Sequence, residues 1–212
     1  MREVKYKTVE ESRLAYKEYV DNHIEAVQYA ARTFGLELAK LIEQFRTSTK
    51  EYDGYHVMLF RMVLEEVKYH DKSKYEEFEF DQYRRHFYPS EEDLQTYTKE
   101  QIDDDFEKAW IHHYNNNEHH PEFWHAEVTE SKFPEKRKLY FKMSNTAFLE
   151  MLLDWIGVSI TFKSNVLDWW NNDKGGKFEK RLMLDNEDMD TISSIFKSMP
   201  EILDFTNSNI EL

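Results

Sequence analysis

The sequence predicts a mainly α-helical protein, in one domain that spans residues 1–212, with one small β-hairpin near residues 127–143. Three observations predict this fold. Apolar residues recur at helical spacing through most of the chain. Several of these runs follow a Ser or Thr residue, the residue types that cap helix N-termini. The length of 212 residues suits a single domain with a substantial core.

The first third of the chain is expected to form three helices. Thr8 and Glu11 have the spacing of a capping box, and the apolar stripe that follows runs until Gly35. A second segment, from Leu36 to Arg46, has apolar residues at helical intervals before a polar interruption. A third helix, from Tyr55 to about Tyr69, is largely apolar. The polar sequence HDKSK follows directly at its end.

The middle of the chain is expected to add two helices and the hairpin. The segment YEEFEFDQYRRHF predicts a shorter helix that Pro89 ends. Thr98 then caps another helix, and its apolar stripe includes His113. Further on, HAEVTESKFPEKRKLYFKMS contains two weakly alternating runs on either side of a Pro-containing turn, which is typical of a hairpin.

The last third contains the most apolar segment. Ser144 or Asn145 caps the sequence AFLEMLLDWIGVSITF, which is apolar almost all round and therefore predicts the central helix. Asp154 lies in the middle of this helix. A final helix is expected near residues 186–198.

Composition and charge exclude several classes of function. The net charge of −14 argues against broad binding of nucleic acid or of an anionic membrane, because both need clustered positive charge. The chain has no cysteine, so any metal must bind His, Asp or Glu. The polar N-terminus does not have the pattern of a signal peptide, and no apolar run approaches the roughly 20 residues of a membrane span. We expect a cytoplasmic protein, with enough aromatic surface for a homodimer.

A series of histidines and carboxylates is the most informative functional feature. His23 and His113 fall on the inward stripes of their helices, and Asp154 lies among apolar residues. His70 and Asp71 are adjacent at a helix end. Divalent transition metals favour imidazole nitrogens and carboxylate oxygens, and these side chains are costly to bury without a partner. The series predicts a metal site, whereas each histidine taken singly also fits a core histidine bonded to a backbone carbonyl.

Further residues widen the candidate set. His119 and His120 follow an Asn-rich turn, and this context does not choose between them. Glu150, one turn before Asp154, is a candidate to orient a ligand or to lie at the polar edge of its helix. The remaining histidines have no comparable context: His56, His86 and His125.

The motif HDKSK and the residues around it resemble the HD-domain metal-dependent phosphohydrolases, a superfamily of helical enzymes. His23, His70, Asp71 and Asp154 match the four ligands of that superfamily in order. The resemblance implies an HD-like helical bundle, and the extra histidines imply a second metal. HDKSK is also similar to the HDIGK form of cyclic-dinucleotide phosphodiesterases, although no GYP element follows the His119–His120 pair. AWIHHYNNNEHHPEFW with EMLLDW resembles more closely still a family of uncharacterised bacterial and phage proteins.

The resemblance implies an enzyme that hydrolyses a phosphoester, a nucleotide or cyclic nucleotide first of all, with a water that a metal activates. One or two divalent ions are expected, chosen from Mn, Fe, Co, Ni, Zn and Mg. Asp71 would act as a catalytic residue as well as a ligand. By resemblance Lys74 contacts a substrate phosphate, and Arg84 and Arg85 are candidates to assist it. The expected ligands are divided between a first ion, bound by His23, His70, Asp71 and Asp154, and a second, bound by His113 with His119 or His120.

Two other functions fit the same residues. An HD-type di-iron oxygenase would use the same ligands, and its extra histidines would help to activate oxygen. A non-catalytic protein would use the metal to join helices, or would hold a nucleotide without cleaving it. A closed coordination sphere would favour this last function, because catalytic sites leave positions open to water.

Overall fold

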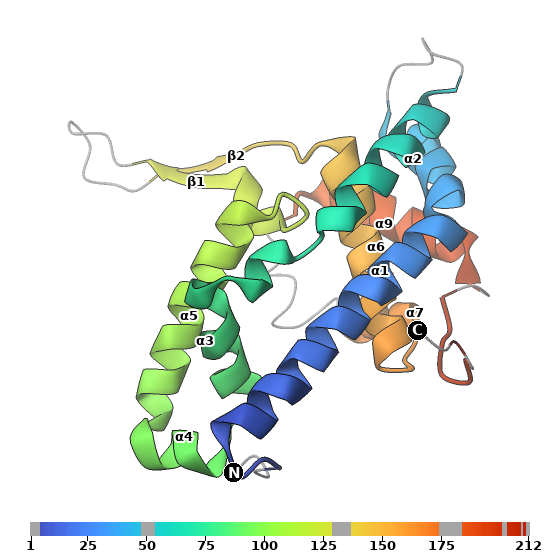
Figure 1. The fold of residues 1–212 in the computed structure, drawn as a ribbon. Helices are drawn as coiled ribbons and strands as arrows, with labels where there is room; N and C mark the ends of the chain where they lie inside the picture. The colour runs from blue at the N-terminus through green and yellow to red at the C-terminus, as the bar shows by residue number, and fades with distance from the viewer. Residues whose placement is uncertain are drawn as a thin grey trace.

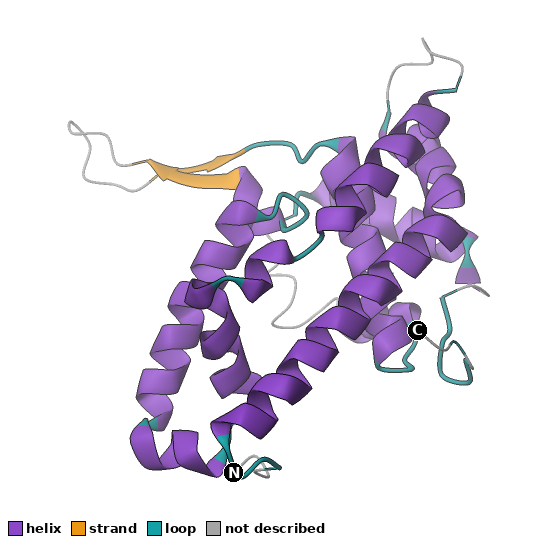
Figure 2. Cartoon of the chain, in the orientation of Figure 1, coloured by secondary structure: helices purple, strands orange, loops and turns teal. Residues whose placement is uncertain are grey.

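The computed structural model describes residues 5–47, 54–128, 137–173, 184–200, 203–208 and 210. These residues form a mainly helical fold, which confirms the predicted fold class (Figures 1 and 2). The α-helices, in chain order, are α1 (Val9–Arg46), α2 (Tyr55–Glu66), α3 (Glu77–Phe87), α4 (Glu91–Thr96), α5 (Lys99–Asn116), α6 (Asn145–Thr161), α7 (Val166–Asp173) and α9 (Asn186–Ser198). Three short 3-10 helices are η1 (Val67–Tyr69), η2 (Lys72–Tyr75) and η3 (Pro121–Trp124).

The predicted hairpin is confirmed, and it begins two residues earlier than expected. Strand β1 (His125–Val128) pairs antiparallel with β2 (Arg137–Tyr140), with His125 opposite Tyr140. The Pro-containing turn lies outside the described residues. In Figure 2 the two strands project away from the helices, so the hairpin does not take part in the helical core.

The prediction that the first helix ends at Gly35 is wrong. Helix α1 runs without interruption from its Thr8 capping box to Arg46. A methyl group at Gly35 would lie 3.1 Å from the Phe60 ring, so the missing side chain makes room for α2. Glycine inside a helix costs about 1 kcal/mol relative to alanine. Close packing against α2 offsets that cost here.

Helix α4 was not predicted from the sequence. Ser90 begins it by accepting a hydrogen bond from the backbone N–H of Asp93, while the Asp93 carboxylate accepts one from the N–H of Ser90. The usual capping-box pattern has Glu or Gln at the third helical position. Because Asp takes that place here, the pattern was easy to miss.

The main core lies between α1 and α6. Helix α6, capped by Ser144, is buried along most of its length, as predicted for the central helix. Gly157 allows the closest approach, because a Cβ there would lie 2.6 Å from Val27 Cγ2 and 3.0 Å from the Val27 backbone nitrogen. Helices α2 and α9 complete this core around the C-terminal half of α1 (Figure 1).

A second, smaller core lies beside the N-terminal half of α1. Tyr16 and Val20 of α1 pack there against Tyr83 of α3 and Ala109 of α5. His23 follows one turn after Val20, so it lies where the two cores meet. Within the part of the chain that the structure describes, no helix has the length and apolar character needed to cross a membrane.

We predict that Gly157→Ala destabilises the fold because the new methyl group meets backbone atoms of Val27 that cannot turn aside. The expected loss in the free energy of unfolding is about 1–3 kcal/mol, measured by urea denaturation. Gly35→Ala is the matched control. Its methyl group meets only the ring of half-buried Phe60, so its loss should be smaller. Equal losses for the two variants would contradict this account of the α1–α6 contact.

Candidate metal centre

Four separate elements bring the candidate ligands to one place. His23 comes from α1 and Asp154 from α6, whereas His70 follows η1 directly. Asp71 adopts a left-handed backbone conformation with φ 54°. Asp tolerates this conformation better than most residues, and it lets the chain turn sharply into η2. The adjacent His70 and Asp71 side chains are thereby both buried within the same cluster.

The first group of ligands consists of His23, His70, Asp71 and Asp154. His23 Nε2 lies 3.1 Å from Asp154 Oδ1 and 3.3 Å from Asp71 Oδ2. His70 Nε2 lies 3.4 Å from His23 Nε2 and 3.5 Å from Asp154 Oδ1. Two imidazole nitrogens and two carboxylate oxygens therefore face one small volume.

The second group lies on the other oxygen of the same aspartate. Asp71 Oδ1 is 3.2 Å from His113 Nε2 and 3.5 Å from His119 Nε2. His120 completes this group, since one potential ligand atom from each of the four residues lies within 4.8 Å of the others. Sequence context could not choose between His119 and His120, and the structure brings both to the cluster.

The atoms that face the second group have no hydrogen bonds. His113 Nε2, His119 Nε2, His120 Nε2 and Asp71 Oδ1 are buried, and none has a hydrogen-bond partner among the described residues. Buried polar atoms are normally paired, because an unpaired one costs free energy. Convergent imidazole nitrogens and a carboxylate oxygen are the donor set of a divalent transition metal. The residues present thus fit a bound metal ion.

Two further carboxylates orient the histidine rings from behind. Glu150 Oε1 lies 3.0 Å from His70 Nδ1 and 3.6 Å from His119 Nδ1. An ionised carboxylate only accepts hydrogen bonds, so the Nδ1 of His70 carries a proton and its Nε2 is the nitrogen that faces the cluster. This is how outer carboxylates fix metal-binding histidines. Of the two roles considered for Glu150, the geometry favours the orienting one.

Glu79 plays the same part for the second group, and sequence reasoning missed it. Its fully buried carboxylate lies 2.9 Å from His113 Nδ1 and 2.7 Å from His112 Nδ1, and it accepts a hydrogen bond from Ser73 Oγ at 3.0 Å. The signal in the sequence was its place four residues before Tyr83, on the inward stripe of α3.

Both carboxylates that face the histidines of the cluster stay ionised. Burial alone would raise the pKa of Asp71, but the positive charges of Lys74, His70 and His113 outweigh burial and hold it well below its usual range. Burial likewise opposes ionisation of Asp154, yet hydrogen bonds from histidines hold its pKa well below the usual range. Ionised carboxylates are the form that binds a metal.

The pKa values of His70 and His120 are shifted in opposite directions, because the two side chains have different neighbours. Burial would lower the pKa of His70, but Asp71, Asp154 and Glu150 raise it to about 10. The three carboxylates therefore favour positive charge around His70. A bound cation would supply such a charge. His120 behaves in the opposite way, because burial and the nearby histidines hold its pKa well below its usual value. Its imidazole is therefore neutral, as a ligand must be.

Lys74 lies beside the cluster, as its place in HDKSK suggested. Its Nζ donates a hydrogen bond of 2.5 Å to Asp71 Oδ2, and its side chain is 13% exposed. Burial alone would lower the pKa of Lys74, but Asp71 and its other neighbours raise it above the usual value. Lys74 remains a cation, and it is suited to electrostatic contact rather than to proton abstraction.

The two arginines expected at the site lie elsewhere. Arg84 is fully buried between α1 and α4, where its guanidinium donates to both Asp93 oxygens at 2.6 and 2.8 Å. The guanidinium of Arg85 lies over the Tyr97 ring, 4.6 Å from its centre, and faces Asp105 of α5. Contrary to the expectation from sequence, both arginines join helices.

Comparison with known families extends over most of the chain. Residues 12–198 match the family model described as "Family of unknown function (DUF5662)". That span includes every residue of both ligand groups. No curated protein and no solved structure matches the chain significantly.

We predict that Arg84→Met lowers the free energy of unfolding by about 3–5 kcal/mol, because it leaves the buried Asp93 charge without its partner. Urea denaturation measures this loss. The control is Arg13→Met, which removes an exposed arginine that pairs with Asp81 and should cost at most about 1 kcal/mol. A variant Arg84→Met that is as stable as wild type but has lost its activity would contradict this account and indicate that Arg84 acts at the candidate site.

The contribution of the Arg84–Asp93 ion pair to the free energy of unfolding should also depend on pH. Burial tends to raise the pKa of Asp93, but hydrogen bonds from Arg84 and Ser90 lower it to about 2. A carboxyl group with a lowered pKa stabilises the fold above its unfolded pKa of about 3.9. The difference in stability between wild type and Arg84→Met should therefore shrink as the pH falls from about 4 towards 2. Acid titration of both proteins measures it.

Proposed function

The chain belongs to DUF5662, a family of unknown function, and we propose that it is a metal-dependent phosphohydrolase that cleaves a phosphoester. The observation that carries the proposal is the position of Asp71. Its Oδ2 faces His23 and its Oδ1 faces His113, so one carboxylate joins two groups of ligands. Such an arrangement suits two metal ions that share a bridging ligand.

The residues divide into two sets that would hold these ions. His23 and His70 lie against Asp71 Oδ2 and also against Asp154, whereas His113 and His119 lie against Asp71 Oδ1, with His120 in the same group. When bound, divalent ions lower the pKa of a coordinated water and offset the charge on phosphate oxygens. Glu150 and Glu79 hold the imidazole rings in place from outside.

Lys74 provides positive charge beside the ligands. It is partly exposed and lies against Asp71 Oδ2, at the edge of the first group. A phosphate oxygen placed there would gain an electrostatic partner that keeps its proton. Asp154 is also partly exposed, with 15% of its side chain accessible. The partial exposure of Lys74 and Asp154 leaves the first group within reach of a substrate.

A second function has one observation in its favour. Three of the four residues of the second group are histidines, a donor set that also suits iron. An HD-type di-iron oxygenase would use these residues to activate oxygen. Iron in the purified protein, together with substrate-dependent oxygen uptake and no phosphoester hydrolysis, would favour this function.

We predict that the protein loaded with Mn²⁺ hydrolyses p-nitrophenyl phosphate or bis(p-nitrophenyl) phosphate, and that Asp71→Ala abolishes this activity by removing the shared ligand. Lys74→Met should keep its metal and lower kcat by about 10²–10³-fold, because it removes only the charge beside the ligands. Release of p-nitrophenol measures both effects.

The matched control for Lys74→Met is Lys72→Met, which removes an exposed lysine from the same 3-10 helix. It should leave kcat within about twofold of wild type, as surface changes away from a site do. An Asp71→Ala variant as active as wild type would contradict the proposed function.

A further inference from the structure

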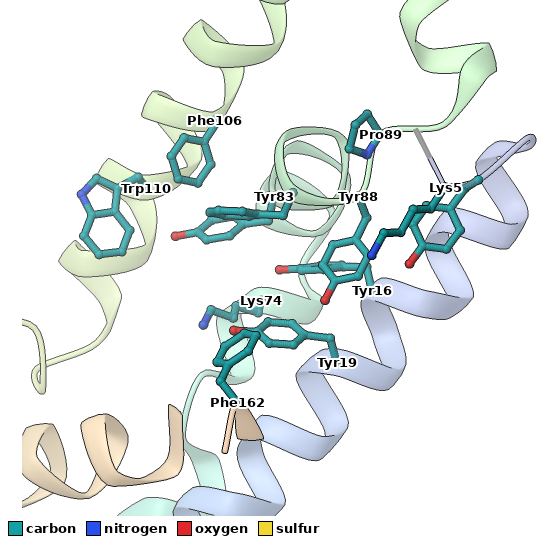
Figure 3. Close-up of a pocket in the computed structure, with 12 residues that line it drawn as sticks. Lys5, Tyr16, Tyr19, Lys74, Tyr83, Tyr88, Pro89, Phe106, Trp110 and Phe162 are labelled. Atoms are coloured by element: carbon teal, nitrogen blue, oxygen red, sulfur yellow. The ribbon is translucent and has the colours of Figure 1, made fainter. Parts of the chain in front are cut away.

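A cavity of about 560 Å³ lies next to the candidate metal centre. Its walls come from α1, α3 and α5, and the aromatic residue that follows α6 also contributes (Figure 3). Nine of its twelve lining residues are aromatic. Small-molecule sites usually measure 300–1,000 Å³ and have mostly apolar walls. In size and in composition this cavity resembles such a site.

The cavity adjoins the ligands through shared walls. Lys74, which contacts Asp71, also lines the cavity. Tyr19 stacks on His23 with ring centres 6.2 Å apart, and Tyr83 meets the His113 ring edge to face at 5.6 Å. A molecule in the cavity is thus separated from both ligand groups by a single layer of side chains.

Two of the tyrosines that line the cavity have a buried hydroxyl group without a hydrogen-bond partner among the described residues. Tyr16 and Tyr83 are 1% and 5% exposed, and neither hydroxyl makes a hydrogen bond within the described residues. In Figure 3 the Tyr16 side chain reaches from α1 towards the middle of the cavity, and the Tyr83 hydroxyl points from α3 towards Trp110 of α5. A buried phenol without a partner costs free energy, which a ligand with a hydrogen-bonding atom would recover.

The charged residues that line the cavity are positive, whereas the chain as a whole has a negative net charge. The net charge of the protein is −14, yet the charged residues that line this cavity are Lys5 and Lys74, and the lining contains no Asp or Glu. The charge on the lining is therefore positive, although Lys74 already pairs with Asp71. Phe87 and Phe162 are 49% and 61% exposed, so they offer aromatic surface that a flat molecule can cover.

We propose that this cavity binds the organic group of the substrate, and that this group is a flat heteroaromatic ring with hydrogen-bonding atoms on its edge, as in a nucleobase. The inference rests on the proposed phosphohydrolase function for the place of the phosphate beside Lys74. Stacking on aromatic side chains selects a flat ring over an aliphatic chain. The unpaired hydroxyls of Tyr16 and Tyr83 select ring nitrogen or oxygen atoms over a plain hydrocarbon.

The test measures binding of four nucleosides, adenosine, guanosine, cytidine and uridine, to the metal-loaded protein by isothermal titration calorimetry. Nucleosides have no phosphate, so their binding reports the cavity alone. At least one should bind with a Kd below about 1 mM, the limit of weak specific binding. Ribose 5-phosphate, which lacks the ring, should bind more weakly than the matching nucleoside monophosphate.

Three variants locate the binding in the cavity. Tyr16→Phe and Tyr83→Phe keep the rings and remove the unpaired hydroxyls, so each should weaken nucleoside binding about two- to tenfold. Phe162→Ala removes an exposed ring and should weaken it about fivefold or more without loss of folding. Tyr140→Phe, which alters an exposed tyrosine on β2, is the control and should bind as wild type does.

The two proposals fail in different ways. Hydrolysis of phosphoesters without binding of any of the four nucleosides would overturn the inference and leave the proposed function standing. Binding that all three cavity variants retain unchanged would overturn it as well. A third outcome is that the protein binds nucleosides, that the cavity variants lose this binding, and that no phosphoester is hydrolysed. This outcome would support the inferred ring-binding cavity and count against the proposed function.

Discussion

The enclosure of two ionised carboxylates among histidines, one buried and one largely buried, is the constraint on which this structure depends. Asp71 and Asp154 lie where four separate elements converge, and each would be costly to bury without positive charge nearby. Lys74 and the imidazole rings supply part of that charge. The imidazole nitrogens around Asp71 Oδ1 that have no hydrogen-bond partner among the described residues mark a place where further positive charge would be stabilised. A divalent cation would meet both needs, since it would bind the carboxylates and the lone pairs of neutral histidines.

The packing of the helices fixes the positions of the side chains in this cluster. The main core fixes α1 against α6, which sets His23 beside Asp154, and the smaller core fixes α3 and α5, which sets Glu79 beside His113. The cluster lies between the two cores. The cavity opens on the smaller core, where aromatic rings replace aliphatic side chains. The candidate ligands and the cavity walls are therefore held by the same helices, which fixes the geometry between them.

Helical periodicity allowed much of the fold and the ligand set to be predicted from sequence. His23, His113 and Asp154 are polar residues at positions where their helices otherwise bury apolar ones, and such local conflict is visible without a structure. Gly35 was misread because a helix breaker and a packing site look the same until the partner Phe60 is known. Arg84 was misread for a related reason, since the sequence does not show whether an arginine meets a phosphate or Asp93.

The cavity could not be predicted from sequence at all. Its lining residues are spread from Lys5 to Phe162, and each aromatic residue taken alone fits a core position equally well. Only the crossing of α1, α3 and α5 gathers them. Tertiary packing decides such features, whereas periodicity decides which face of a helix is buried.

The most direct test of a shared-carboxylate metal centre is the metal content per chain, measured by elemental mass spectrometry after purification without chelator and reconstitution. The account predicts about two equivalents in the wild-type protein. Asp154→Ala, which alters only the first group, and His120→Ala, which alters only the second, should each lower the content by about one equivalent. A wild-type protein that holds no metal after reconstitution would contradict the account and make these histidines structural.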